Sequence, residues 1–166
     1  WANVAAAAVN RVGVRPSLVF GMVLLTAGLA YFAQISVGGS YWADLFPGFL
    51  VIGLGMPFCF VPITIGAVAG TGHDQAGLAS GLINTSQQIG GALGIAVLST
   101  VAISHTEALV GDGAAEPVAA VEGFQRAFWV GAAIAVLGVL VSVFLVRDED
   151  LRPAEEIVLE PAAEAA

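Results

Sequence analysis

A cluster of neutral polar side chains interrupts a long apolar run of the sequence. Residues 84–88, which read NTSQQ, supply two hydroxyls and three amides within residues 77–101, a run without Asp, Glu, Lys, Arg or His. Amides and hydroxyls are poor acids and bases but good hydrogen-bonding groups, and an unsatisfied amide in hydrocarbon costs several kcal/mol. The cluster must therefore face another helix or a polar cavity.

Residue types that support catalysis or metal binding are sparse. Cys59 is the single cysteine and lies within the apolar stretch GLGMPFCFVPI, where it suits a small apolar filler. His73 and His105 fall in different predicted loops on opposite sides of a membrane, so they cannot share a metal. No predicted span carries paired carboxylates, and the acidic segments lack the basic, aromatic-rich character of a nucleic-acid site. We therefore expect no enzyme activity, no metal or cofactor and no nucleic-acid partner.

The elements that position these groups are expected to be membrane spans. The chain of 166 residues is 58% apolar and 11% charged, and its mean hydropathy is +0.90. These values lie well outside the range of soluble domains. About 20 uncharged helical residues cross a hydrocarbon core of roughly 30 Å. The predicted fold class is an all-α integral membrane protein with transmembrane helices at residues 18–37, 45–69, 77–103 and 126–146.

The remaining segments are expected to be a helix end, loops and a tail. Residues 1–9 read as the end of a preceding transmembrane helix, because Trp1 is not an initiator Met, so we expect a fragment of a longer protein. Residues 10–17 are a predicted loop, and residues 104–125 form an acidic loop with several Gly and Pro. The acidic tail at 147–166 is rich in Ala, Glu and Pro, which predicts disorder.

Five basic residues, all arginine, predict the orientation in the membrane. Arg11 and Arg15 precede the first span, Arg147 and Arg152 follow the fourth, and Arg126 lies at the opposite side. The positive-inside rule then places the N-terminal loop and the C-terminal tail in the cytoplasm and the acidic loop outside. We expect a multi-pass protein of the cell (cytoplasmic) membrane, in which the Arg126 side chain snorkels to the headgroups.

The second predicted span combines prolines with glycines. Pro57 and Pro62 each remove a helical hydrogen bond, which a membrane tolerates only where neighbours or water satisfy the freed carbonyl groups. Gly53 and Gly55 allow close packing. We expect this span to be bent and packed against protein, whereas the first and fourth spans are nearly pure hydrocarbon.

The third predicted span carries a stripe that is both small and polar. At 3.6 residues per turn, one face holds Gly77, Gly81, Asn84, Gln88 and Gly91. The pairs Gly77/Gly81 and Gly90/Gly94 would let another backbone approach closely. Two explanations for the amides stay open: hydrogen bonds between helices, each worth about 0.6–2 kcal/mol, or the lining of a polar cavity. Three clustered amides favour the cavity for the stripe as a whole.

Residues 76–101, AGLASGLINTSQQIGGALGIAVLSTV, resemble the penultimate-helix signature of the major facilitator superfamily, in its fourteen-helix drug:proton antiporter group (EmrB/QacA type). Residues 47–64, PGFLVIGLGMPFCFVPIT, are similar to the preceding helix of that group. Residues 123–140, GFQRAFWVGAAIAVLGVL, are similar to its last helix. Residues 9–16, VNRVGVRP, resemble its cytoplasmic gating loop, whose pattern is D-R-x-G-R-R.

The gating-loop pattern is matched in part. Arg11, Gly13 and Arg15 agree with it, whereas Asn10 stands where the family has Asp and Val14 where it has Arg. Whether a charge relay works without this Asp stays open. The two arginines could still contact acidic groups or the carboxyl ends of helices.

The resemblance implies the last four helices of a carboxyl-terminal six-helix bundle, plus the end of the helix before them. The first and fourth spans would face lipid, and the second and third would line the cavity or the interface with the missing N-terminal half of the same chain. It also implies proton-coupled efflux of drugs or other amphipathic small molecules, driven by the proton gradient, with proton-carrying acids outside this chain. Cavity or interface candidates are Asn84, Thr85, Gln87, Gln88, Gly91, Phe58 and Phe60.

Two alternatives remain open at this point. An exporter of the same superfamily that carries a metabolite or another solute would share every motif. A non-transporting membrane scaffold protein would need no kinked, amide-lined span. A channel is disfavoured, because neither rings of charged residues nor a carbonyl filter motif is present.

Overall fold

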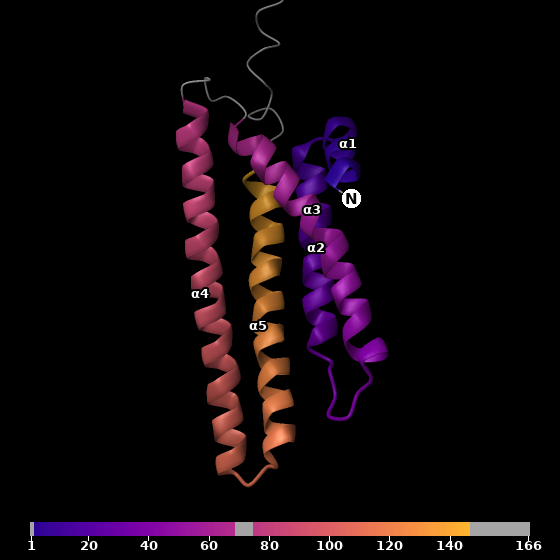
Figure 1. The fold of residues 1–166 in the computed structure, drawn as a ribbon, viewed down its shortest axis with the longest axis vertical. Helices are drawn as coiled ribbons and strands as arrows, with labels where there is room; N and C mark the ends of the chain where they lie inside the picture. The colour runs from indigo at the N-terminus through magenta and orange to yellow at the C-terminus, as the bar shows by residue number, and fades with distance from the viewer. Residues whose placement is uncertain (1, 69–74, 147–166) are drawn as a thin grey trace, which may run out of the picture.

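The computed structural model describes residues 2–68 and 75–146, which form helices joined by short turns (Figure 1). The elements are α1 (Ala2–Val12), α2 (Val14–Phe32), the π-helical turn η1 (Tyr41–Leu45), α3 (Phe46–Val68), α4 (Ala76–Gly111) and α5 (Glu116–Phe144). Within this part of the chain, four helical segments are long and apolar enough to cross a membrane, with η1 and α3 counted together. The predicted all-α fold class with four potential transmembrane helices is confirmed.

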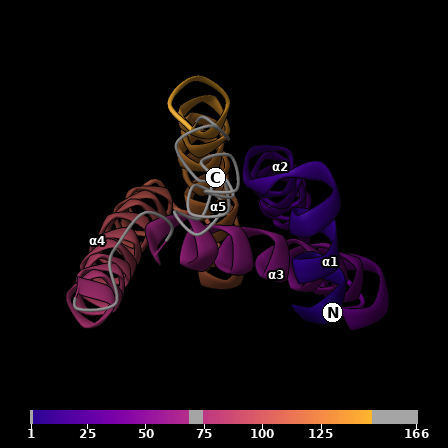
Figure 2. The same cartoon turned by 90° about the horizontal axis from the view of Figure 1, so that it is seen from above.

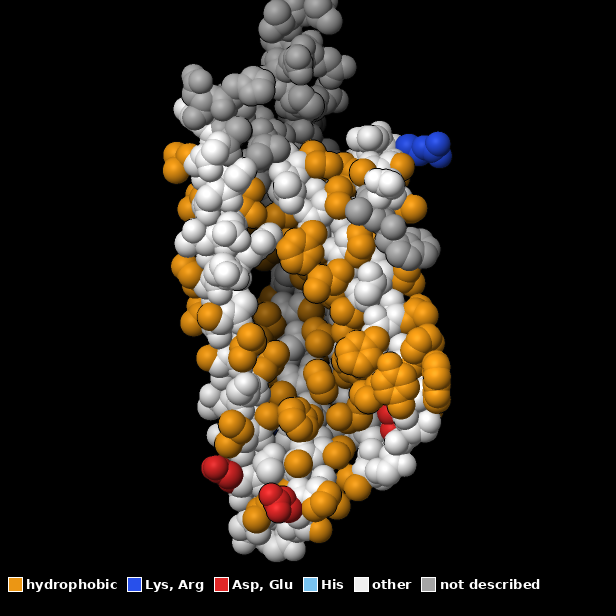
Figure 3. Space-filling model, viewed as in Figure 1, with side chains coloured by type: hydrophobic (Ala, Val, Ile, Leu, Met, Phe, Trp, Pro, Cys, Tyr) orange, Lys and Arg blue, Asp and Glu red, His pale blue; other side chains and the backbone are white. Residues whose placement is uncertain are grey.

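The long helices form two antiparallel hairpins, α2 with α3 and α4 with α5, and α2 packs beside α5 to join them. Seen from above, α3 runs from the α1 side across towards α4 (Figure 2). In Figure 3 hydrophobic side chains gather most densely over α2 and α3 and are sparser along α4, with arginine at the α1 end and acidic residues towards the other end. This pattern suits a bilayer, where charged groups belong outside the hydrocarbon.

Glycines allow the backbones of α2 and α3 to touch. A Cβ added at Gly21 would lie 2.7 Å from the carbonyl carbon of Phe58 and 2.8 Å from Sγ of Cys59. A Cβ added at Gly55 would lie 2.9 Å from Cβ of Leu24. Neither space admits a methyl group, so this hairpin is held by the close backbone approach that is common in membrane proteins.

Small residues also join α4 to α5. A Cβ added at Gly123 would lie 2.2 Å from Oγ1 of Thr106 and 2.6 Å from the carbonyl oxygen of Ala102. The Thr106 hydroxyl lies 2.8 Å from the carbonyl oxygen of Ala102 and 3.2 Å from that of Ala119, so it links the two helices. The buried residues of α5 are all small: Ala119, Gly123, Ala127, Gly131, Ala132, Ala135 and Ser142.

A single glycine separates α1 from α2. Gly13 has φ 101°, in the left-handed region where other residues are strained. Two residues later, Nη2 of Arg15 donates a hydrogen bond of 2.5 Å to the carbonyl oxygen of Val143, in the last turn of α5. A cation at the carboxyl end of a helix is favourable because the unpaired carbonyls there carry partial negative charge. Of the two kinds of contact open to the arginines, Arg15 makes the one with the carboxyl end of a helix, while its role in a gate stays a prediction.

The loop expected over 104–125 is wrong in its extent. Helix α4 continues to Gly111 and α5 begins at Glu116, so only residues 112–115 form the turn. The predicted span at 77–103 and the predicted start at 126 marked the end of the apolar run rather than the end of the helix. Ala, Glu and Leu sustain a helix in water as well as in lipid, and Pro117 is tolerated because it lies in the first turn of α5.

Other predicted boundaries also shift. The loop expected over 10–17 is wrong, because α2 starts at Val14 and Pro16 is accommodated in its first turn. The span expected over 18–37 ends at Phe32, and hydrogen-bonded turns follow it. The helix expected at 1–9 is present as α1 and runs to Val12. The predicted acidic tail and His73 lie outside the described residues.

The two internal prolines of α3 lie at Pro57 and Pro62. Pro62 is fully buried, with less than 2% of its surface exposed. Figure 1 shows α3 changing direction along its length and leaning towards α4 in its last turns. A proline in a helix interior frees a carbonyl group and pushes the preceding turn aside, which accounts for this course.

Candidate functional site: the amide and glycine face of α4

The polar residues that the sequence singles out share one open surface of α4. Asn84, Thr85, Gln87, Gln88 and Gly91 are all exposed. In the apolar stretch of α4, 6% of the residues are buried within the described chain, compared with 28% of those in α2. The structure therefore gathers the candidates on one helix and leaves them uncovered.

The amides of this surface have no partner among the described residues. The side chains of Asn84, Gln87 and Gln88 make no hydrogen bond in that part of the chain, whereas Oγ1 of Thr85 donates to the Gly81 carbonyl oxygen of its own helix at 2.9 Å. The first explanation for the amides, hydrogen bonds between helices, is therefore not seen among the described residues. Within a bilayer, their partners must be another helix or water in a cavity.

The glycines of α4 are equally open. A Cβ added at any of five positions would meet no atom within 4 Å: Gly77, Gly81, Gly90, Gly91 and Gly94. The close approach predicted for these positions is not formed among the described residues, so it stays a prediction for a neighbour beyond them. Tight contacts occur instead at other glycines, among them Gly21 and Gly123, for which no packing role was predicted. The seven-residue interval from Gly21 to Gly28 spans two helical turns and could have indicated a packed face.

The candidates on α3 divide between packing and exposure. The Phe58 ring lies edge-on to Phe20 of α2, with 5.2 Å between ring centroids, so it packs within the hairpin. Phe60 is 46% exposed and available to a substrate or a neighbouring helix. Gly55 makes a close contact with α2, while Gly53 is exposed with open space around it. Figure 3 shows a hollow between α4 and the rest of the molecule.

Hydrogen bonds across the turn that follows α2 went unpredicted. Nε2 of Gln125 donates to the Ile35 carbonyl oxygen at 2.6 Å, and Oγ of Ser36 donates to Oδ2 of Asp44 at 3.0 Å. The Tyr31 hydroxyl also donates to a backbone carbonyl in η1. Assigning residue 125 to a loop concealed its role, because a glutamine on a helix facing a turn can satisfy that turn's carbonyls.

Few described residues have the character of a reactive centre. Cys59 is 5% exposed and packs against α2, as expected for an apolar filler. No group of three or more His, Cys, Asp and Glu side chains that could hold a metal occurs in residues 2–68 and 75–146. The chemistry that this surface offers is hydrogen bonding and close helix contact.

The chain is similar to a drug-resistance protein and to proteins named as transporters. It is 34% identical over 139 residues to the puromycin resistance protein pur8 of Streptomyces alboniger, a match covering 82% of this chain and 27% of that protein. It is 29% identical over 125 residues to the low affinity ammonium transporter of Saccharomyces cerevisiae, covering 75% and 23%. It is 33% identical over 99 residues to EfpA of Mycobacterium tuberculosis, named as an uncharacterized MFS-type transporter, covering 59% and 19%.

These similarities support the major facilitator superfamily (MFS). The chain spans about a quarter or less of the length of these relatives. No family model matches it. The MFS resemblance of its motifs thus agrees with the comparisons, while the fourteen-helix group stays a prediction.

Proposed function

We propose that this chain is the carboxyl-terminal part of an MFS transporter that exports drugs or other amphipathic small molecules in exchange for protons. The puromycin resistance protein among its relatives supports a drug as cargo. The arginines at the α1 end support a cell-membrane orientation in which the α1–α2 junction faces the cytoplasm. The acids that carry protons would lie outside this chain.

The open face of α4 is the observation that carries this proposal. Three amide side chains and five glycines stand on a membrane-length helix without a neighbour among the described residues. Lipid cannot satisfy an amide, and glycines give lipid little to pack against. A second helical bundle that rocks against this face would supply contacts in one state and a water-filled path in the other, as alternating access requires.

This assignment gives each element a role. Helix α4 would face the N-terminal half of the same chain, and the exposed side of α3, with Phe60, would line the cavity. Helices α2 and α5 would form the support, because they pack against each other and carry small buried residues. Arg11, Gly13 and Arg15 would form the cytoplasmic gate at the end of this support.

Replacement of Gln88 by Ala tests the proposal. In the full-length transporter, Gln88→Ala is expected to lower the initial rate of proton-driven uptake of a fluorescent amphipathic cation into inverted vesicles by several-fold. Its membrane abundance should stay near wild type, because the amide makes no hydrogen bond within the described chain. A protonophore should abolish transport in both proteins.

A matched control is Gln34→Ala, because this exposed glutamine lies in the turn after α2 and donates its amide to the Ala30 carbonyl oxygen, in the last turn of α2, at 3.2 Å. The control is expected to transport normally. Equal loss of rate and abundance in Gln88→Ala would instead assign the amide to packing. An unchanged rate would contradict a role in the cavity.

A second candidate cargo follows from the similarity to a yeast protein named as an ammonium transporter. A small polar solute would need the amides of α4 but not the aromatic ring on α3. Uptake of ammonium and of an amphipathic dye by wild type and Phe60→Ala separates the two candidates. Dye transport by wild type that Phe60→Ala abolishes supports amphipathic cargo. Ammonium uptake that Phe60→Ala leaves unchanged, in a wild-type protein that does not transport the dye, supports the second candidate.

A further inference from the structure

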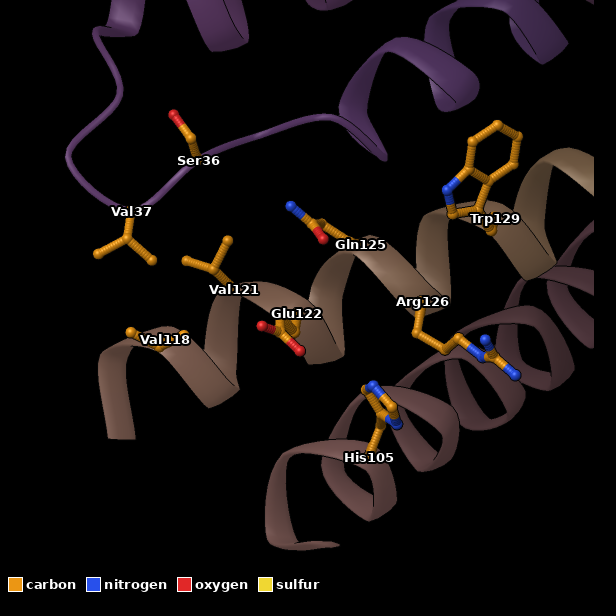
Figure 4. A pocket seen from close by; sticks show the side chains of 9 residues that line it. All are labelled: Ser36, Val37, His105, Val118, Val121, Glu122, Gln125, Arg126 and Trp129. Carbon is orange, nitrogen blue, oxygen red and sulfur yellow. The ribbon is translucent and has the colours of Figure 1, made fainter. Parts of the chain in front are cut away.

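A polar pocket lies at the end of the molecule opposite the α1–α2 junction. It has a volume of about 380 Å³ and lies between α4, α5 and the turn that follows α2 (Figure 4). Its polar lining comprises Ser36, His105, Glu122, Gln125 and Arg126, and Trp129 closes the membrane side. The open face of α4 that carries the proposed function is not part of this pocket.

The charged groups of this pocket are not paired with each other. Glu122 and Arg126 are four residues apart on α5, a spacing at which opposite charges commonly pair. In the part of the chain that the structure describes, neither they nor His105 has an ion pair or a side-chain hydrogen bond. Figure 4 shows the Arg126 side chain extending away from Glu122, with the His105 ring of α4 between the two in this view. The pocket therefore presents an anion and a cation at separate places.

Gln125 adds an acceptor to the anionic side of the pocket. Its Nε2 is committed to the Ile35 carbonyl oxygen, so Oε1 is left to accept a hydrogen bond. One part of the pocket thus offers oxygens to a group with N–H donors, and the other offers N–H donors to an acceptor with negative charge. A zwitterion that carries an ammonium and a phosphate matches both parts.

The pocket continues into an exposed apolar stripe on the same face of α5. Residues spaced three or four apart from the pocket residues form this stripe: Trp129, Ala133, Val136, Leu137 and Leu140. Trp129 is 54% exposed and Leu137 is 61% exposed. From residue 129 to 140 the helix rises about 16 Å, close to the hydrocarbon depth of one leaflet.

From this juxtaposition we propose that the pocket binds a phosphatidylethanolamine-type phospholipid. Arg126 and His105 hold the phosphate, Glu122 and Oε1 of Gln125 accept hydrogen bonds from the ammonium, and an acyl chain lies along the apolar stripe of α5. Trp129 lies at the boundary between headgroup and hydrocarbon, where tryptophan is favoured. A free phosphate ester would share the polar contacts but would leave the stripe without a partner.

Native mass spectrometry of the full-length protein in detergent tests the proposal, with phosphatidylethanolamine and phosphatidylglycerol of equal acyl chains as probes. Arg126→Ala is expected to weaken the binding of both lipids about tenfold, because a charge-assisted contact with the phosphate that they share is lost. Glu122→Gln is expected to weaken phosphatidylethanolamine about three- to tenfold and to leave phosphatidylglycerol unchanged, because only the former carries an ammonium. Arg126→Lys should restore most of the binding.

Glu116→Gln is the matched control, since Glu116 is exposed on the first turn of α5 and does not line the pocket. It should bind both lipids like wild type. Unchanged lipid binding by Arg126→Ala, or an equal loss of binding of the two lipids by Glu122→Gln, would overturn the proposal. Displacement of bound lipid by millimolar phosphoethanolamine or inorganic phosphate would also overturn it, in favour of a soluble phosphate compound.

Discussion

Replacement of Gly123 by Ala probes the contact between α4 and α5. The new methyl group would lie 2.2 Å from Oγ1 of Thr106 and 2.6 Å from the Ala102 carbonyl oxygen. The carbonyl belongs to backbone and cannot move aside cheaply, so we expect overpacking to cost about 1–3 kcal/mol. Moving Thr106 away also weakens its link to Ala119 on α5, worth about 1 kcal/mol.

A gain in helix propensity opposes this loss. Glycine to alanine inside a helix stabilises by about 0.5–1 kcal/mol where space is available. For Gly123→Ala we expect a net decrease of about 1–3 kcal/mol in the free energy of unfolding. Gly111→Ala on α4 is the control, because a Cβ there would meet no atom within 4 Å.

Unfolding of the purified full-length variants in mixed detergent micelles, followed by circular dichroism as the fraction of sodium dodecyl sulfate rises, measures this difference. Gly111→Ala should unfold at or slightly above the wild-type midpoint, and Gly123→Ala clearly below it. Equal midpoints for the two variants, or a higher midpoint for Gly123→Ala, would refute the inferred packing of α4 against α5.

Three further outcomes follow from other contacts. Arg15→Ala should lower the free energy of unfolding by about 1 kcal/mol, because the hydrogen bond to the last turn of α5 is lost. Arg11→Ala removes an exposed side chain and should leave that free energy unchanged, and the same denaturation assay compares the two variants. Gln125→Ala should increase amide hydrogen exchange in the turn after α2, since the carbonyl oxygen of Ile35 loses its donor, and unchanged exchange would argue against that contact. Cys59, at 5% exposure, should react with a maleimide far more slowly in the folded than in the unfolded protein, in a background whose other cysteines are replaced; equal rates would contradict its burial.

Hydropathy predicted the number of long helices but not where they end. A run such as 77–103 marks the residues that lipid tolerates, and the helix continues through His105 and Glu107 because helical hydrogen bonds do not require lipid. The proline at position 117 suggested a loop, yet in a first helical turn its missing N–H is harmless. Periodicity can locate an apolar or polar face, but caps and first-turn prolines decide the boundaries.

The candidate site was predicted in its residues rather than in its surroundings. Helical spacing placed Asn84 and Gln88 on one face, because that follows from 3.6 residues per turn alone. Which helix a face meets depends on contacts between distant segments, and no local pattern in the sequence sets them. For the same reason the pairing of Gly123 with Thr106, and the pocket lined by both His105 and Arg126, emerged only from the packed helices.

The length of α4 has a practical consequence for following movement in this protein. Its 36 residues rise about 54 Å, well beyond a hydrocarbon core of roughly 30 Å. Charged residues appear on α4 only after position 104, so we expect the turn at 112–115 to lie outside the hydrocarbon. Thr106 links α4 to α5, so we expect the ends of the two helices next to this turn to move together. A spin label or an antibody fragment attached at this turn would magnify a small tilt of the hairpin into a displacement large enough to measure.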